Sequence, residues 1–263
     1  MSLEKLLFAL LTAPVIAPVP TTVTHQVVAQ APAQQAPAPA APAQAAPKAE
    51  APKAAEAPKA AEKKMAPEVK DLVERMQAFY EKTQDFTSDF KQDYKYKALR
   101  RTQTSTGKVT YKKPGLMRWE YEKPSKRTFV LAGEKVYAYD PEAQTLSVGR
   151  IDTTQLSASV TFLFGQGKLA DEFSISKGEC KDCKGTLLVL DPLKADPRFR
   201  QVRLEVDPKT AQVLKSTVVD PDGSENTISF LGLKTNVGVA ADSFKLNPPE
   251  GTRIDDFTKA TRK

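Results

Sequence analysis

The sequence has one histidine, two cysteines and one tryptophan among its 263 residues. The single histidine, His25, lies in an N-terminal stretch that we expect to be removed. The remaining chain then has no imidazole for a catalytic triad, a histidine-based metal site or proton transfer near neutral pH. We therefore expect a protein that is not an enzyme and that has no metal site and no cofactor.

The sequence also lacks an apolar run long enough to span a bilayer, which takes about 20 residues. Residues 6–19 are apolar, but Pro14 and Pro18 interrupt them. The residues at 27–29 are small or β-branched, as a signal peptidase requires. We interpret residues 1–29 as a cleaved signal peptide and expect a periplasmic protein; an uncleaved membrane anchor is the alternative. No cysteine follows the apolar run, so no lipid-modified N-terminus is expected.

Residues 30–65 have too little variety to form a core. Positions 30–64 contain 16 Ala and 7 Pro, and the hexapeptide APKAAE occurs twice in tandem. The recurrent Pro prevents one continuous helix, so the pattern predicts a semi-rigid spacer. One domain, residues 66–263, remains, and it is long enough for a sizeable core.

Positive charge is concentrated in residues 91–127. This stretch contains 12 Lys and Arg against three Asp and Glu, a local net charge of +9, whereas the whole chain carries +7. The cations either lie on water-exposed outer faces of edge strands, or they form a basic rim that docks on an acidic protein or on anionic headgroups. Nucleic acid is not expected, because the chain is predicted to be exported and has no stacking motif.

Asp-Pro dipeptides separate short segments in which apolar and polar residues alternate. This dipeptide commonly begins a turn, so the pattern indicates an antiparallel meander. About eleven strands are predicted, which is too many for a flat open sheet. Their ranges are 84–96, 105–113, 116–122, 126–132, 135–140, 144–150, 173–178, 185–191, 200–207, 212–219 and 225–234.

Few helices are predicted. Residues 67–82 and residues 154–165 each place apolar side chains at helical spacing on one side, and a short turn is expected at 240–244. The simplest architecture is mainly β: one long curved sheet with two or three helices against its concave side.

Large apolar side chains alternate along the predicted strand 116–122. Arg118 points away from them. They form either an ordinary core or an adaptable cavity for an apolar ligand. The side chains that share a side within a strand are Met117, Trp119 and Tyr121, then Phe129 with Leu131, and Tyr137 with Tyr139.

Cys180 and Cys183 form a CxxC motif. In an oxidising compartment we expect a structural disulfide that closes the hairpin between two strands. A redox site is the alternative, but such sites place the first cysteine at a helix N-terminus, and no helical pattern surrounds this motif. A zinc site would need two further ligands, which the mature chain lacks.

Four motifs occur in order across residues 66–258. They are Phe90-Lys91-Gln92, Lys113–Tyr121 with Pro124, Gly133–Pro141 (GEKVYAYDP) and Phe244–Asp256 (FKLNPPEGTRIDD). Together they resemble LolA, the periplasmic outer-membrane lipoprotein carrier family. The resemblance implies a single unclosed antiparallel β-barrel, or half-barrel, of about eleven strands with a helical lid on its concave face. It also implies an apolar cavity for lipoprotein acyl chains.

The resemblance further implies partners. They are acylated lipoproteins, an inner-membrane lipoprotein-releasing ABC transporter as donor, and an outer membrane with or without a dedicated receptor; we expect a monomer. A stationary lipid- or lipoprotein-binding or sensing module on the same fold is the alternative.

The resemblance also implies residue roles. Lys113 occupies the place of a family arginine that holds the lid closed, and a lysine offers no planar fork for that task. The residues predicted to line the acyl-chain cavity are Leu72, Met76, Met117, Trp119, Tyr121, Phe129, Leu131, Tyr137, Val160, Leu163 and Phe164.

Overall fold

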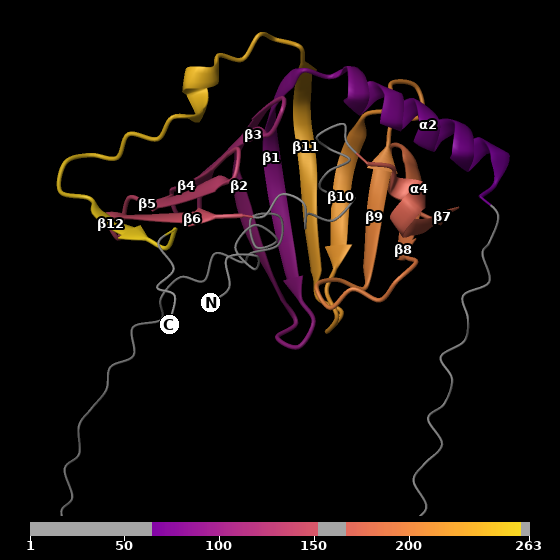
Figure 1. The fold of residues 1–263 in the computed structure, drawn as a ribbon. Helices are drawn as coiled ribbons and strands as arrows, with labels where there is room; N and C mark the ends of the chain where they lie inside the picture. Colours follow the sequence, from indigo (N-terminus) through magenta and orange to yellow (C-terminus); the bar gives the residue numbers. More distant parts are fainter. Residues whose placement is uncertain (1–64, 152–166, 259–263) are drawn as a thin grey trace, which may run out of the picture. The chain divides into compact units, whose positions relative to one another are not determined.

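Twelve strands make one sheet in the computed structural model, which describes residues 65–151 and 167–258 (Figure 1). The strands are β1 (Asp85–Tyr96), β2 (Arg101–Lys112), β3 (Leu116–Lys123), β4 (Arg127–Ala132), β5 (Lys135–Asp140), β6 (Thr145–Arg150), β7 (Phe173–Lys177), β8 (Thr186–Pro192), β9 (Gln201–Val206), β10 (Val213–Val219), β11 (Glu225–Thr235) and β12 (Arg253–Asp256).

The strand order is β12-β6-β5-β4-β3-β2-β1-β11-β10-β9-β8-β7. Each half of the sheet is a meander of neighbouring hairpins, and the pairing of β1 with β11 joins the halves. The outermost strands, β12 and β7, do not pair with each other, so the described sheet is unclosed. The prediction of a mainly β, unclosed sheet is confirmed.

The eleven predicted strands are present, and the twelfth is a strand that the sequence analysis missed. β12 pairs with β6 in parallel, so the sheet is not purely antiparallel as predicted. Its four residues, Arg253–Asp256, are mostly charged and show no alternation of apolar and polar side chains. Backbone hydrogen bonds fix the chain at both ends of this strand. One such bond runs from Arg253 N to Gln144 O at 2.9 Å.

Helix α2 (Pro67–Lys82) has the predicted bounds. Pro at the first helical position needs no N–H partner, and the acidic Glu68 and the basic Lys82 lie at the ends that the helix dipole favours. The buried stripe consists of Val69, Leu72, Val73, Met76 and Tyr80. α2 therefore packs one apolar face against the sheet.

Two short helical turns complete the described elements. They are α4 (Leu169–Glu172), which was not predicted, and the 3₁₀ turn η2 (Ala241–Phe244), which matches the turn expected at 240–244. The predicted helix 154–165, the signal peptide and nearly all of the linker lie outside the described residues. Within the part of the chain that the structure covers, no helix has the length and apolar character needed to cross a membrane.

Most of the buried apolar residues form two clusters on one face of the sheet, which we call the inner face. The first lies between α2 and strands β7–β10, and the second lies on β1–β5 and β11. Phe230 of β11 packs against both clusters, so the apolar surface continues across the join of the two halves. Among the described residues, only the first cluster contains helical side chains of α2.

The opposite, outer face is covered in part by residues 236–252, which we call the strap. Figure 1 shows this segment in yellow, running from the end of β11 past β3 and β4 to β12. η2 lies against β3 and β4, and Phe244 is buried there. The strap thus connects the centre of the sheet to its β12 edge.

Candidate functional site

The inner face of β1–β5 carries a group of contacting aromatic rings. The Phe90 ring lies edge-on to Trp119, with centroids 4.8 Å apart, and to Tyr121 at 5.1 Å. Tyr121 in turn lies 5.8 Å from Phe129. Such edge-to-face pairs are favoured by the ring quadrupoles, so this part of the face is both apolar and well ordered.

Gly107 of β2 allows this packing. A Cβ at this position would lie 2.0 Å from the carbonyl oxygen of Glu120 and 2.9 Å from the Phe90 ring. Only glycine therefore lets β3 and the Phe90 ring approach so closely.

Two side chains of the group are less buried than the rest. Trp119 is 3% exposed and donates from Nε1 to the sulfur of Met117 at 2.9 Å, whereas Met117 and Phe129 are only half-buried. Methionine and aromatic side chains adapt to apolar ligands of variable shape. These two residues are therefore accessible positions on this part of the face.

The apolar surface ends at a buried polar row. The Tyr121 hydroxyl donates to Gln92 Oε1 at 3.0 Å, and Gln92 Nε2 donates to Asn226 Oδ1 at 3.0 Å. Burial raises the pKa of Tyr121 far above its ordinary value, so the hydroxyl stays protonated. The sequence analysis listed Gln92 in a motif but assigned it no role, because Asn226 lies on a strand far along the chain.

Lys113 lies at the end of α2. Its Nζ donates to the carbonyl oxygen of Glu81 at 2.6 Å and to that of Tyr80 at 3.2 Å. These carbonyls belong to the last turn of the helix, where backbone acceptors lack helical partners and a cation is favourable. Lys113 therefore ties α2 to the turn between β2 and β3. The predicted helix 154–165 lies outside the described residues, so the role of Lys113 as the latch of a lid stays a prediction.

The structure brings together part of the predicted cavity. Met117, Trp119, Tyr121, Phe129 and Leu131 share the second cluster. Leu72 and Met76 lie in the first cluster, beneath α2, and not beside Trp119. Val160, Leu163 and Phe164 lie outside the described residues.

The prediction for Tyr137 is wrong. In the β4–β5 hairpin Leu131 pairs with Val136, and Tyr137 pairs with Val130. Directly paired residues share a face, so Tyr137 lies on the outer face with Val130, opposite to Leu131. Alternation within one strand fixes relative faces only inside that strand, and the hairpin register decides which set is inner.

Arg118 lies on the outer face, as predicted. Its guanidinium donates to the carbonyl oxygens of Ser243 at 3.4 Å and Lys245 at 3.3 Å, and it forms an ion pair with Glu120 at 2.8 Å. Arg118 therefore holds the strap against β3.

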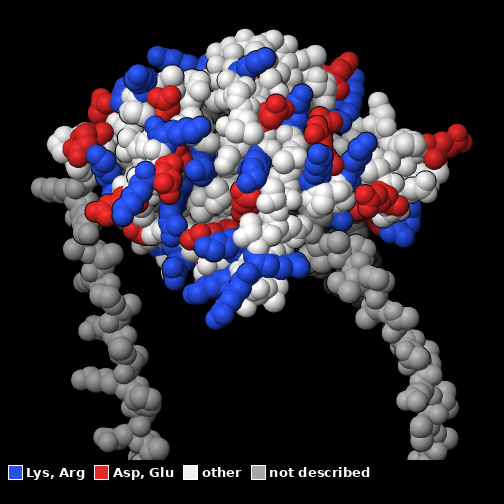
Figure 2. Space-filling view, turned by 180° about the vertical axis from the view of Figure 1, so that it is seen from behind, with Lys and Arg blue, Asp and Glu red and all other residues white. Residues whose placement is uncertain are grey.

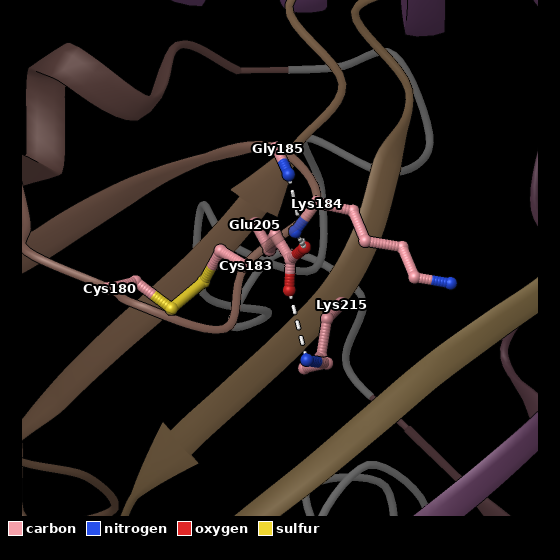
Figure 3. The surroundings of a disulfide bond; sticks show 6 residues. All are labelled: Cys180, Cys183, Lys184, Gly185, Glu205 and Lys215. Atoms are coloured by element: carbon pink, nitrogen blue, oxygen red, sulfur yellow. Dashed lines mark hydrogen bonds and ion pairs between the residues drawn. A yellow bond between two sulfur atoms is a disulfide. The ribbon is translucent and has the colours of Figure 1, made fainter.

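Cys180 and Cys183 are joined by a disulfide in the hairpin between β7 and β8 (Figure 3). The loop is held by the buried carboxylate of Glu205, which accepts from the backbone N–H of Lys184 at 2.7 Å and of Gly185 at 3.2 Å. Lys215 Nζ lies 2.9 Å from Glu205 Oε2. The contacts of Glu205 join the hairpin loop to β9 and β10, which is the arrangement of a structural brace.

A separate pocket of about 340 Å³ lies at the β7 edge. It contains none of the predicted cavity residues. The residues that line it include Asp171, Glu172, Phe173, Asp196 and Phe199. Within the described ranges, no group of His, Cys, Asp or Glu is arranged to hold a metal ion.

Comparisons with known proteins identify relatives. Residues 81–247 match the family model described as "Outer membrane lipoprotein carrier protein LolA". The outer-membrane lipoprotein carrier protein of Pseudomonas paraeruginosa is 27% identical over 183 residues, which cover 69% of this chain and 86% of that protein. The protein of the same name from Azotobacter vinelandii is 27% identical over 184 residues, with 69% and 86% covered. An uncharacterized conserved protein from Thermus thermophilus aligns in structure with a TM-score of 0.47 and 11% identity, over 71% of this chain and 98% of that one.

Proposed function

Because the chain belongs to the LolA family of outer-membrane lipoprotein carrier proteins, we propose that it is a soluble periplasmic carrier that shields lipoprotein acyl chains between the inner and the outer membrane. The observation that carries the proposal is the apolar inner face of β1–β5, on which contacting aromatic rings lie beside the half-buried Met117 and Phe129. No side chain of α2 belongs to this cluster.

Shielding is needed because an exposed acyl chain is costly. At about 0.8 kcal/mol per methylene, a chain of roughly 16 carbons in water costs about 13 kcal/mol. A carrier must bury most of that surface and still release it, so a face of adaptable side chains fits the task better than a rigidly filled core.

The proposal includes partners. An inner-membrane lipoprotein-releasing ABC transporter supplies acylated lipoproteins, and the outer membrane receives them, with or without a dedicated receptor. The carrier acts as a monomer and performs no chemical step on its cargo.

Mass spectrometry of acylated species that co-purify with the protein from its host tests the proposal. A carrier yields lipoproteins with their acyl chains. Recovery of phospholipid or glycolipid alone would instead favour a stationary lipid-binding module.

Phe129→Gln should weaken binding of a triacylated peptide, because a polar amide replaces an accessible ring on the inner face. Loss of one such contact, worth about 1.5–3 kcal/mol, corresponds to roughly 10-fold to 100-fold weaker binding. Trp119, the single tryptophan, reports binding: we expect its emission to be quenched or shifted further to the blue.

Tyr137→Gln is the matched control, since it changes a half-buried aromatic residue on the outer face of the adjacent strand. Equal losses in both variants, or emission that stays unchanged at saturating peptide, would show that the inner face of β1–β5 is ordinary core.

A further inference from the structure

The turn between β1 and β2 combines an exposed apolar side chain with four cations. Leu99 is 63% exposed and lies in the turn of residues 97–100, with Lys95 and Arg101 on the adjoining strands. We call Lys95, Lys97, Leu99, Arg100 and Arg101 the basic tip. All five side chains are exposed, so none of them contributes much to the core.

The cations of the basic tip are not paired with carboxylates in the described part of the chain. Further along the same hairpin, Lys91 pairs with Asp93 at 2.8 Å and Lys108 approaches Asp89 at 4.0 Å. At the turn, by contrast, no ion pair among the described residues holds the cations, so a partner from outside can approach them.

The acidic residues beside the tip already have partners. Glu225, the cross-strand neighbour of Lys95, forms an ion pair with Arg203 at 3.1 Å. In the neighbouring β10–β11 turn, Asp220 accepts from the hydroxyl of Tyr94, and Asp222 accepts from the backbone and hydroxyl of Ser224. Ser224 Oγ in turn accepts from Lys97 N at 3.2 Å. The second turn thus supports the basic tip. Its two carboxylates keep their negative charge, but the tip carries four cations, so the two turns together retain a net positive charge.

Tyrosine rings form the base of the tip. The Arg101 guanidinium lies 5.1 Å from the centre of the Tyr96 ring, and Tyr94 and Tyr96 are 4.5 Å apart. Tyrosine and arginine beside an exposed leucine are the residues found where a protein meets the headgroup region of a bilayer.

We propose that the basic tip docks the protein on a membrane surface that carries anionic lipids, with Leu99 inserted at the headgroup boundary. Figure 2 shows Lys and Arg side chains gathered at the lower edge of the view, which is the end where the β1–β2 turn lies in Figure 1. A lipid surface fits better than an acidic protein, because a single leucine at the apex of a two-stranded turn needs no complementary pocket in a bilayer.

The proposal goes beyond carriage of acyl chains, because docking needs no cargo in the inner face. The test is co-sedimentation with vesicles, and it uses the protein as its host processes it. More protein should sediment with phosphatidylcholine vesicles when they contain phosphatidylglycerol, and high salt should reverse this increase.

Neutralising Arg100 and Arg101 together, as R100Q/R101Q, should weaken this binding about 25-fold, since each basic side chain near an anionic surface contributes a factor of about 5. Leu99→Ser should weaken vesicle binding by a smaller factor, and this factor should be the same at low and at high salt.

Matched controls carry the same changes elsewhere. Lys181→Gln with Lys209→Gln removes two exposed cations at the other end of the strands, and Leu231→Ser changes a leucine that is 52% exposed on β11. Equal losses in the tip variants and the controls, or no preference for phosphatidylglycerol, would overturn the proposal. If the tip variants lose vesicle binding but still transfer cargo, the docking proposal and the carrier function are separate properties. If the tip variants bind vesicles normally but no longer bind an acidic protein, the tip is the binding site for that protein and the docking proposal is wrong.

Discussion

Single side chains hold the elements of this protein together by bonds to backbone carbonyls and amides. Lys113 is the clearest case, since its ammonium group binds two carbonyl oxygens at the end of α2. A guanidinium could bridge the same two acceptors with a planar fork. One substitution at position 113 should therefore strengthen or weaken the contact between α2 and the β2–β3 turn.

Lys113→Leu should leave the fold intact and shorten the retention of a triacylated peptide about fivefold, the effect of roughly 1 kcal/mol of lost hydrogen bonding. Lys113→Arg should retain the peptide at least as long as the natural chain. Peptide release and handover to acceptor vesicles are the measurements, with Lys112→Leu as the neighbouring control. Identical kinetics in all variants would leave Lys113 as one more surface cation.

Glu205 should make stability depend on pH. Burial raises the pKa of this carboxyl. The hydrogen bonds from Lys215 and from two backbone amides lower the pKa by more than burial raises it, so the pKa lies below its ordinary value. A depressed folded-state pKa adds stability above the unfolded-state value of about 4.3, and this stability is lost as pH falls through the folded-state pKa.

Glu205→Gln should therefore lower the free energy of unfolding by about 1–3 kcal/mol at neutral pH, and the difference should shrink below about pH 4. Denaturant unfolding across pH measures it. Glu225→Gln, which breaks the more exposed ion pair with Arg203, should have little effect at any pH. A pH-independent difference for Glu205→Gln would contradict the charge-based explanation.

The sequence allowed us to predict which residues share a face of a strand, but not which residues of other strands they contact. Alternation correctly placed Trp119 on the same face as Tyr121, and Phe129 on the same face as Leu131, and the family resemblance singled out Lys113. The bond between Gln92 and Asn226 was not predictable, because the two residues are 134 positions apart and nothing local in either strand indicates the other.

At the scale of elements, long alternating segments were predictable and short polar ones were not. The bounds of α2 and β5 agree with prediction. β2 begins at Arg101, earlier than predicted, because its first residues are polar and exposed and show no alternation. α4 and β12 have four residues each, too few for any periodicity to appear.

Apart from η2, the strap has no regular structure, and one buried carboxylate fixes its start. Asp85, 4% exposed, accepts from the backbone N–H of Val237 at 2.7 Å and from those of Gly238 and Val239 at 3.2 Å. Asn236 N also donates to the Asp85 carbonyl oxygen at 2.7 Å. One acidic side chain on β1 thus satisfies three consecutive amides of the strap.

Asp85→Asn should loosen the start of the strap, because an amide group offers one acceptor oxygen and turns an N–H group towards donors. We expect hydrogen exchange at Val237, Gly238 and Val239 to accelerate at least about tenfold, the effect of roughly 1.4 kcal/mol. Amides of β1 and β2 should stay protected. Asp89→Asn, an exposed change on the same strand, is the control, and equal exchange in both variants would contradict the prediction.

At the scale of the molecule, the sheet is two hairpin series that meet at β1 and β11. The sequence indicated eleven of the twelve strands but not this order, since alternation does not say which strands are neighbours. β6 and β7, which follow one another among the described strands, lie near opposite edges of the sheet, and the first strand of the chain, β1, lies at its centre.

This strand order has a consequence for how the chain acquires its structure. Strands β1–β6 and β7–β11 each pair locally, and such pairs form early because little loop-closure entropy is lost. β1, by contrast, can pair with β11 only after β11 has been synthesised, and β11 is among the last segments of a chain made from its N-terminus. The apolar rings of β1–β5 are therefore without their neighbouring strand for most of that time, and this half of the molecule is where we expect a newly made chain to depend on assistance against aggregation.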